Sequence, residues 1–126
     1  MEFAKTGNGI KPKTGDRVTV HYTGKLVNGD VFDSSVKRGE PFSFIIGIGQ
    51  VIKGWDLGVM EMDLGSKATI TCAPSHGYGE RGFPPVIPRN ATLIFEVSCC
   101  EIASLFLYSS YMGLLIQYYH PSCFLG

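Results

Sequence analysis

The sequence predicts an α+β fold in which mostly antiparallel strands pack around one short helix. In several short stretches, apolar and polar side chains alternate with the two-residue period of a half-buried strand. Only residues 51–62 carry apolar side chains at helical spacing before the end of the chain. The 16 glycines and 7 prolines gather between these stretches, as turn residues do. Short strands that alternate with turns around one helix indicate an α+β domain.

The first strongly marked elements form a predicted hairpin. Valine and tyrosine alternate with threonine and histidine over residues 18–22, and this strand extends toward Leu26. We expect His21, on the polar side of the strand, to face solvent. Asn28-Gly29 tolerates a positive φ at both central positions of a two-residue turn. The apolar pattern that resumes over 31–33 then forms the returning strand.

The remaining elements follow in order. Residues 42–46 alternate again and place two phenylalanines on one face of a third strand. Residues 51–62 form the helix, but two internal glycines make it weak alone, so packing on the sheet must hold it. Strands over 68–72 and 93–99 flank a loop at 74–90, whose length indicates a function.

Composition excludes several classes of protein. The 11 basic and 11 acidic residues balance, which argues against nucleic acid as the main partner. The 4 cysteines are irregularly spaced and form no CxxC pair, so we expect neither a disulfide framework nor zinc. The 3 histidines are far apart in the chain, and we expect no metal and no cofactor. No apolar run follows the N-terminal charges, so a cytoplasmic protein is predicted.

Two other chemistries receive little support. Gly47-Ile48-Gly49 lacks the further glycine of a dinucleotide loop and the Lys-Ser or Lys-Thr of a P-loop. A cysteine nucleophile paired with histidine stays open from sequence alone. Cys72 and Cys99 nevertheless occupy inward strand positions, where cysteine usually acts as a small core residue.

Apolar and aromatic residues gather at strand ends and loops, and the segments that contain them resemble a known family. They are VHYTGKLVNGDVFDSS, PFSF, GQVIKGWDLGV, GYGERGFPPVIP and NATLIFEV. In this order they are similar to the FKBP-type peptidyl-prolyl cis-trans isomerases, the small immunophilins that bind tacrolimus and rapamycin. The resemblance runs from about residue 7 to 97. It implies a curved antiparallel sheet wrapped around one short helix, with a proline-sized pocket between them.

The resemblance also implies which residues form the site. Those implied for catalysis are Tyr22, Phe32, Asp33, Trp55, Tyr78 and Phe95. Those implied for substrate or ligand binding are Arg38, Phe42, Gln50, Val51, Ile52, Phe83, Val86 and Ile87. Trp55 would form the pocket floor, and the Ile52 N–H would hold the substrate chain. Asp33 would face the twisting carbonyl and pair with Arg38, while the Tyr78 phenol would donate a hydrogen bond.

The implied activity is rotation about X–Pro peptide bonds during protein folding, without a cofactor. Implied partners are X–Pro peptides and folding proteins, tacrolimus and rapamycin, and, through those drugs, calcineurin or the rapamycin target kinase; a monomer is expected. The alternative is a non-catalytic module that binds proline or macrolides. Phe83 stands where many relatives carry histidine, which affects ligand preference, and Gln50 replaces a common glutamate.

The end of the chain has a different composition. All charged residues lie between Glu2 and Glu101, and residues 102–126 carry none. We therefore divide the chain into an isomerase domain, residues 1–100, and an apolar tail, residues 101–126.

Two origins of this tail are considered. The family pattern fails at Val97-Ser98, where valine and serine codons can spell the start of an intron, and we favour intron read-through. The alternative is a tail anchor, because residues 102–119 reach the lower length limit of a membrane helix. Serines within it and the lack of flanking Lys or Arg weigh against an anchor.

Overall fold

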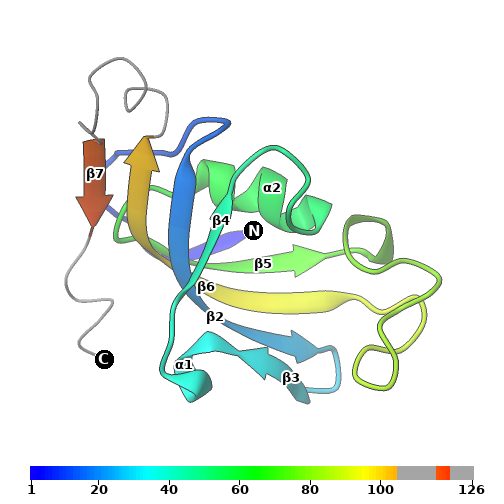
Figure 1. The fold of residues 1–126 in the computed structure, drawn as a ribbon. Coiled ribbons are helices and arrows are strands. Elements are labelled where there is room, and N and C mark those ends of the chain that lie inside the picture. Colours follow the sequence, from blue (N-terminus) through cyan, green and yellow to red (C-terminus); the bar gives the residue numbers. More distant parts are fainter. Residues whose placement is uncertain (105–115, 120–126) are drawn as a thin grey trace.

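The computed structural model of the chain describes residues 1–104 and 116–119. They contain one seven-stranded antiparallel sheet in the order β1-β5-β6-β2-β3, with β4 also paired to β2 and β7 to β6 (Figure 1). The strands are β1 (Glu2–Lys5), β2 (Arg17–Leu26), β3 (Val31–Ser34), β4 (Phe42–Ile45), β5 (Lys67–Cys72), β6 (Leu93–Ser104) and β7 (Ile116–Tyr119). The helices are α1 (Ser35–Arg38), α2 (Lys53–Gly58) and the 3-10 turns η1 (Val59–Glu61) and η2 (Pro74–His76). The predicted α+β class is confirmed.

The central pair of the sheet is β2 and β6. These strands pair from Arg17 opposite Ala103 to Leu26 opposite Leu93. The alternation predicted for β2 is present, since Val18, Val20 and Tyr22 are buried and point to the core. α2 crosses this face of the sheet and continues into η1 (Figure 1).

The helix is held by packing, as its two glycines predict. Trp55 of α2 and Val59 of η1 are buried against the sheet. A β-carbon at Gly54 would lie 2.2 Å from Cys72 Sγ, so α2 approaches β5 too closely for a side chain there. Glycine therefore weakens the helix locally and permits the contact that stabilises it.

The hairpin between β2 and β3 forms with a different turn from the one expected. Gly29 has a φ of 95°, but Asn28 does not have a positive φ. The Gly29 N–H donates to Leu26 O at 2.9 Å, which closes a turn before the glycine. Asn28 instead uses its side chain, whose Oδ1 accepts from Asp30 N at 2.9 Å. The predicted hairpin is therefore confirmed, and of the two residues that tolerate a positive φ only Gly29 adopts one.

The expectation of a single helix candidate is also wrong. α1 is a four-residue helix between Ser34, which accepts from Lys37 N, and Gly39, which ends it in the left-handed conformation. Such a short helix contains too few residues for apolar periodicity to appear. Its caps were the available sequence signal.

β6 continues past the predicted boundary after residue 100. Ile102 is 2% exposed and belongs to the core, and β7 pairs with the end of β6 from Glu101 to Ser104. Residues 101–104 therefore lie in the sheet, while most of the tail, residues 105–115 and 120–126, lies outside the described residues, as does most of the span considered for a tail anchor. Within the part of the chain that the structure describes, no helix is long and apolar enough to cross a membrane.

Candidate active site

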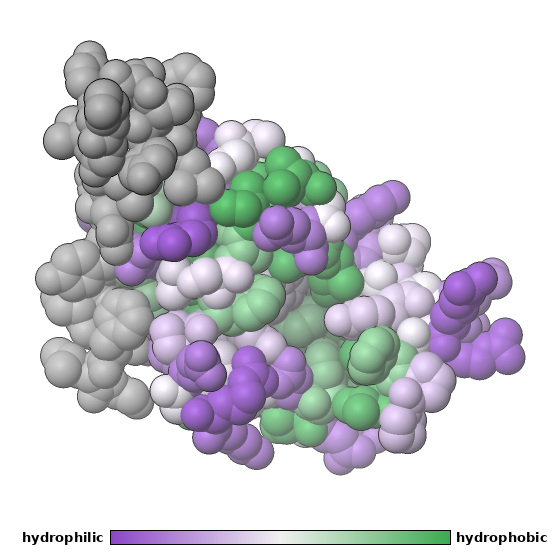
Figure 2. Space-filling view, viewed as in Figure 1, coloured by the Kyte–Doolittle hydropathy of each residue, from purple (hydrophilic) through white to green (hydrophobic). Residues whose placement is uncertain are grey.

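A cavity of about 390 Å³ opens between α2 and the strands β2, β3 and β4. Its lining residues are Tyr22, Phe32, Asp33, Phe42, Gln50, Val51, Ile52, Trp55, Tyr78 and Phe95. All of them are among the residues that the resemblance implied. In the space-filling view, apolar side chains surround a recess in the middle of the visible face (Figure 2). The sequence segments that carry the resemblance thus meet at one hollow.

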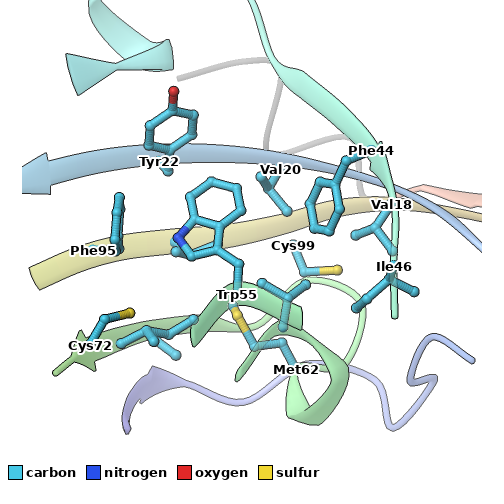
Figure 3. Packing of buried hydrophobic residues seen from close by; sticks show 14 of the residues in the cluster. Val18, Val20, Tyr22, Phe44, Ile46, Trp55, Met62, Cys72, Phe95 and Cys99 are labelled. Carbon is cyan, nitrogen blue, oxygen red and sulfur yellow. The ribbon is translucent and has the colours of Figure 1, made fainter. Parts of the chain in front are cut away.

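Trp55 lies at the bottom of this cavity and contacts four aromatic rings. Its ring centroid is 4.9 Å from Tyr22 and 5.3 Å from Phe95, both in edge-to-face contact. Phe42 lies 5.9 Å away. Figure 3 shows the indole rising from α2 between Tyr22, Phe95 and Phe44. The indole is 4% exposed, and its buried Nε1 has no hydrogen-bond partner among the described residues. The floor is therefore an indole packed among aromatic rings.

The segment before α2 fixes the direction of the helix. Ile52 is extended, and its carbonyl accepts from Trp55 N at 3.0 Å and Asp56 N at 3.2 Å. The Asp56 carboxylate accepts from Gly47 N and Gly49 N, both at 2.9 Å. These bonds tie the loop after β4 to the helix, beside the cavity that Ile52 and Trp55 line.

Tyr22 and Asp33 form a polar part of the cavity wall, and Arg38 stands behind them. The Tyr22 hydroxyl donates to Asp33 Oδ2, and the Arg38 guanidinium donates to Asp33 Oδ1. Arg38 also donates to the Tyr22 hydroxyl at 3.3 Å and lies 5.7 Å above its ring. The pairing expected between Asp33 and Arg38 is present. Burial, followed by the hydrogen bond to Asp33, raises the pKa of Tyr22, so the phenol keeps its proton at neutral pH.

Tyr78 provides a second hydroxyl from the loop that follows β5. Its side chain is 40% exposed and its ring lies 5.7 Å from that of Phe83. Burial, and then the negative charge of Asp33, raises the pKa of Tyr78. A protonated phenol at the cavity edge is a hydrogen-bond donor.

Four of the residues implied for ligand binding do not line the cavity: Arg38, Phe83, Val86 and Ile87. Arg38 stands behind Asp33, as described. Phe83 is 60% exposed and Val86 is 45% exposed, so both lie on the surface of the loop. Ile87 is 3% exposed and belongs to the hydrophobic core, so its side chain points inward. Whether these residues touch a ligand stays a prediction.

Gln50 has a local structural contact. Its side-chain Oε1 accepts from Ile45 N at 2.8 Å, where β4 ends. A glutamate carboxylate has the same acceptor, so the change from the common family residue conserves this bond.

The expectation that His21 faces solvent is wrong. His21 is half-buried, and its Nδ1 lies 2.9 Å from the hydroxyl of Ser35. Ser35 is 0% exposed, and no sequence pattern assigned it a role. The only sequence signal for such a role was the pair of serines after Asp33. Serine hydroxyls often bond to nearby backbone groups, but at the end of a strand they usually do so within a turn.

The chemistry of a cysteine nucleophile does not fit Cys72. Burial raises the pKa of its thiol to about 11, so the thiolate is scarce at neutral pH. Cys72 and Cys99 are both buried in the core, as their strand positions predict. In residues 1–104 and 116–119 no three His, Cys, Asp or Glu side chains gather where they could hold a metal ion.

Comparisons with known proteins agree with this geometry. A family model described as FKBP-type peptidyl-prolyl cis-trans isomerase matches residues 8–99. FK506-binding protein 1 of Rhizopus delemar is 59% identical over 103 residues, which cover 81% of this chain and 95% of that protein. FK506-binding protein 1A of Aspergillus fumigatus is 63% identical over 102 residues, covering 80% and 91%. A peptidyl-prolyl cis-trans isomerase of Schizosaccharomyces pombe is 58% identical over 102 residues, with the same coverage.

Proposed function

Because the chain belongs to the FKBP-type peptidyl-prolyl cis-trans isomerase family and is such an isomerase, we propose that it acts by binding the proline ring against Trp55. The cavity there has one apolar floor and aromatic walls. A proline ring is apolar and flat enough to lie on the indole face.

The reaction breaks no bond, so it requires no nucleophile. Rotation about X–Pro must pass a barrier of about 18–20 kcal/mol, because resonance keeps the amide planar. That resonance puts negative charge on oxygen and positive charge on nitrogen, and a twisted amide loses this separation. An apolar pocket therefore favours the twisted amide relative to the planar one. Each tenfold of rate requires about 1.4 kcal/mol, so several modest contacts are sufficient.

Polar groups on the cavity wall interact with the carbonyl group of the substrate as it rotates. The Tyr22 hydroxyl is engaged by Asp33, and Arg38 lies against both. This group presents fixed dipoles to a carbonyl that turns toward it, at no further cost of ordering. Tyr78 donates from the edge of the cavity, and the Ile52 N–H holds the substrate backbone beside it.

The observation that carries the proposal is Trp55, buried at the cavity floor and in contact with four aromatic rings. We expect Trp55→Ala to lower kcat/KM for a proline tetrapeptide by at least tenfold, since it removes the surface on which the ring lies. Cis-trans turnover is measured by coupling to a protease that cleaves only the trans peptide.

Leu57→Ala is the matched control for this test. Leu57 lies in the same helix but is 63% exposed and does not line the cavity. Its variant should retain the wild-type rate. Equal rates for Trp55→Ala, for Tyr78→Phe combined with Phe95→Ala, and for the wild type would reject the pocket as the site of catalysis.

We further propose that the cavity binds tacrolimus and rapamycin. Two of the relatives above are named for FK506, which is tacrolimus, and the cavity is of a size that takes a ring and its carbonyls. Exposed Phe83 and Val86 lie beyond the cavity, where a bound drug would leave them available to calcineurin or to the rapamycin target kinase. Inhibition of the protease-coupled rate by each drug tests binding. Capture of either partner only in the presence of its drug tests the second step.

The cellular role we propose is that of a monomer in the cytoplasm that accelerates X–Pro rotation in folding proteins. A pocket that binds only one proline and its neighbouring residue can act on many different unfolded chains. Refolding of a protein limited by proline isomerisation should accelerate when this protein is added, and Trp55→Ala should not accelerate it. Light scattering measures the monomer mass, and carbonate extraction of membranes from cells that express the full chain tests the tail anchor.

A further inference from the structure

A gap in strand pairing lies directly behind the polar wall of the cavity. β3 pairs with β2 up to Thr23, and the pairing with β4 begins at Val20. On this side His21 and Tyr22 therefore have no strand partner. Buried backbone groups require hydrogen bonds, so something else must satisfy Tyr22.

The hydroxyl of Ser35 fills this gap. Its Oγ accepts from Tyr22 N at 2.7 Å and donates to Tyr22 O at 3.3 Å. It also lies 2.9 Å from His21 Nδ1. A hydroxyl has one donor and two acceptor sites. If Nδ1 carries a proton, His21 and the Tyr22 N–H occupy both acceptor sites and Tyr22 O takes the hydrogen.

The same residue begins the helix that carries Arg38. Ser35 is the first residue of α1, and Arg38 is the last. Arg38 reaches back over the Tyr22 ring and binds Asp33, which accepts from the Tyr22 hydroxyl. One buried hydroxyl thus joins the strand that holds the phenol to the helix that holds the guanidinium.

We propose that Ser35 is a positioning residue for the isomerase reaction: it keeps Tyr22 and Arg38 in the relative placement that aims the Tyr22–Asp33–Arg38 group at the rotating carbonyl. The inference rests on the proposed role of the cavity. Ser35 touches neither cavity nor substrate and acts through Tyr22.

Ser34 offers a matched control for a Ser35 variant. It is the same residue type at the adjacent position, 6% exposed, and it caps α1 through Lys37 N at 3.3 Å. Its hydroxyl also contacts Thr23 at 3.1 Å, but it makes no bond to Tyr22. Loss of stability is expected from both Ser34→Ala and Ser35→Ala, whereas only the second change should disturb the site.

The test compares the two variants well below their unfolding temperatures. We expect Ser35→Ala to lower kcat/KM three- to tenfold, chiefly through kcat, because a buried N–H loses its partner and Tyr22 shifts. Ser34→Ala should retain the wild-type kcat/KM. The fluorescence of Trp55, the only tryptophan and 4.9 Å from Tyr22, should change in the Ser35 variant alone.

A double-mutant cycle separates positioning from general stability. If Ser35 acts through the phenol, Ser35→Ala should cost much less in a Tyr22→Phe background than in the wild type. Equal fold losses in both backgrounds, or equal behaviour of the Ser34 and Ser35 variants, would overturn the inference. Wild-type and Trp55→Ala rates measured alongside show separately whether the cavity acts as proposed.

The unmutated protein provides a readout if Ser35→Ala does not fold. The Tyr22 amide should exchange with deuterium as slowly as strand-paired amides of β2, although no strand pairs with it on that side. Fast exchange at Tyr22 beside slow exchange at its paired neighbours contradicts the placement of the Ser35 hydroxyl and the proposal with it.

Discussion

At the scale of single residues, the site combines an apolar floor with one compensated charge pair. Asp33 and Arg38 stand side by side, and Tyr22 bonds to both. Charges placed this way form a fixed dipole beside the cavity without adding a net charge to it. The apolar character that favours a twisted amide is therefore retained next to the ionised groups.

The two charges should move the titration of Tyr22 in opposite directions. Asp33 raises the pKa of Tyr22, and Arg38 lowers it. We expect the pKa of Tyr22 to fall in Asp33→Asn and to rise further in Arg38→Gln. Phenolate absorbance near 295 nm, taken as the difference from Tyr22→Phe, measures both shifts. Shifts of the same sign in the two variants would contradict the arrangement.

The raised pKa also affects stability at high pH. In the unfolded chain tyrosine loses its proton near pH 10, whereas folded Tyr22 keeps its proton to higher pH. The native state then binds more protons than the unfolded state, so the free energy of unfolding falls as pH rises above about 10. Tyr22→Phe should make this fall shallower.

At the scale of elements, the strands were the most predictable part of the fold. Apolar and polar residues alternate over 18–22 and 68–72 because one face of each strand is buried, and this pattern is visible in the local sequence. α1 and the turn type of the hairpin depend on single side chains, Ser34 and Asn28, that satisfy backbone groups. His21 was misplaced because its partner Ser35 comes from another element, and periodicity does not report such contacts.

The site was predictable for a different reason. Residues that meet at the cavity, such as Trp55 and Phe95, come from segments far apart in the chain, and no local pattern joins them. The resemblance supplied that association. It did not indicate that Ile87 points to the core, because burial of a loop residue depends on how the loop folds back.

The two glycines of α2 provide a prediction at this scale. A β-carbon at Gly54 would lie 2.2 Å from Cys72 Sγ and 3.3 Å from His76 O, whereas at Gly58 the nearest atom is Ile70 Cδ1 at 2.9 Å. We expect Gly54→Ala to lower the free energy of unfolding by about 2 kcal/mol through overpacking. Gly58→Ala should change it by under about 1 kcal/mol, because the flexible end of Ile70 moves aside and alanine favours helix.

Chemical denaturation measures both changes, and a second substitution checks their cause. Cys72→Ala removes the sulfur that the new methyl group meets, so it should recover part of the loss in Gly54→Ala. A Gly54→Ala variant as stable as the wild type would show that α2 can move away from β5.

At the scale of the whole molecule, the end of β6 decides where the folded domain stops. Ile102 is buried, Arg17 pairs with Ala103, and Glu101 forms an ion pair with Arg17 at 3.5 Å. A chain that ends at residue 104 keeps these contacts. A chain that ends at residue 100 loses them, so its free energy of unfolding should be lower by about 3 kcal/mol. Thermal and urea unfolding of the two truncations measures the difference.

Equal stability of the two truncations would show that residues 101–104 add nothing to the core. The intron read-through hypothesis has its own test, since a spliced transcript that departs from this sequence after Val97 would support it. A mature message that encodes the tail throughout would contradict it.

The pairing of β2 with β6 has a consequence for how the chain acquires its structure. The first partner of the pair, Arg17, and the last, Ala103, are separated by nearly the whole described chain. To form contacts this distant in sequence, the chain must first lose the conformational entropy of a long loop, and the stabilising contacts form only afterwards. This slows folding. During synthesis, β2 emerges early and must wait until β6 leaves the ribosome. A proline isomerase with this fold therefore completes its own core only after most of its chain has been made.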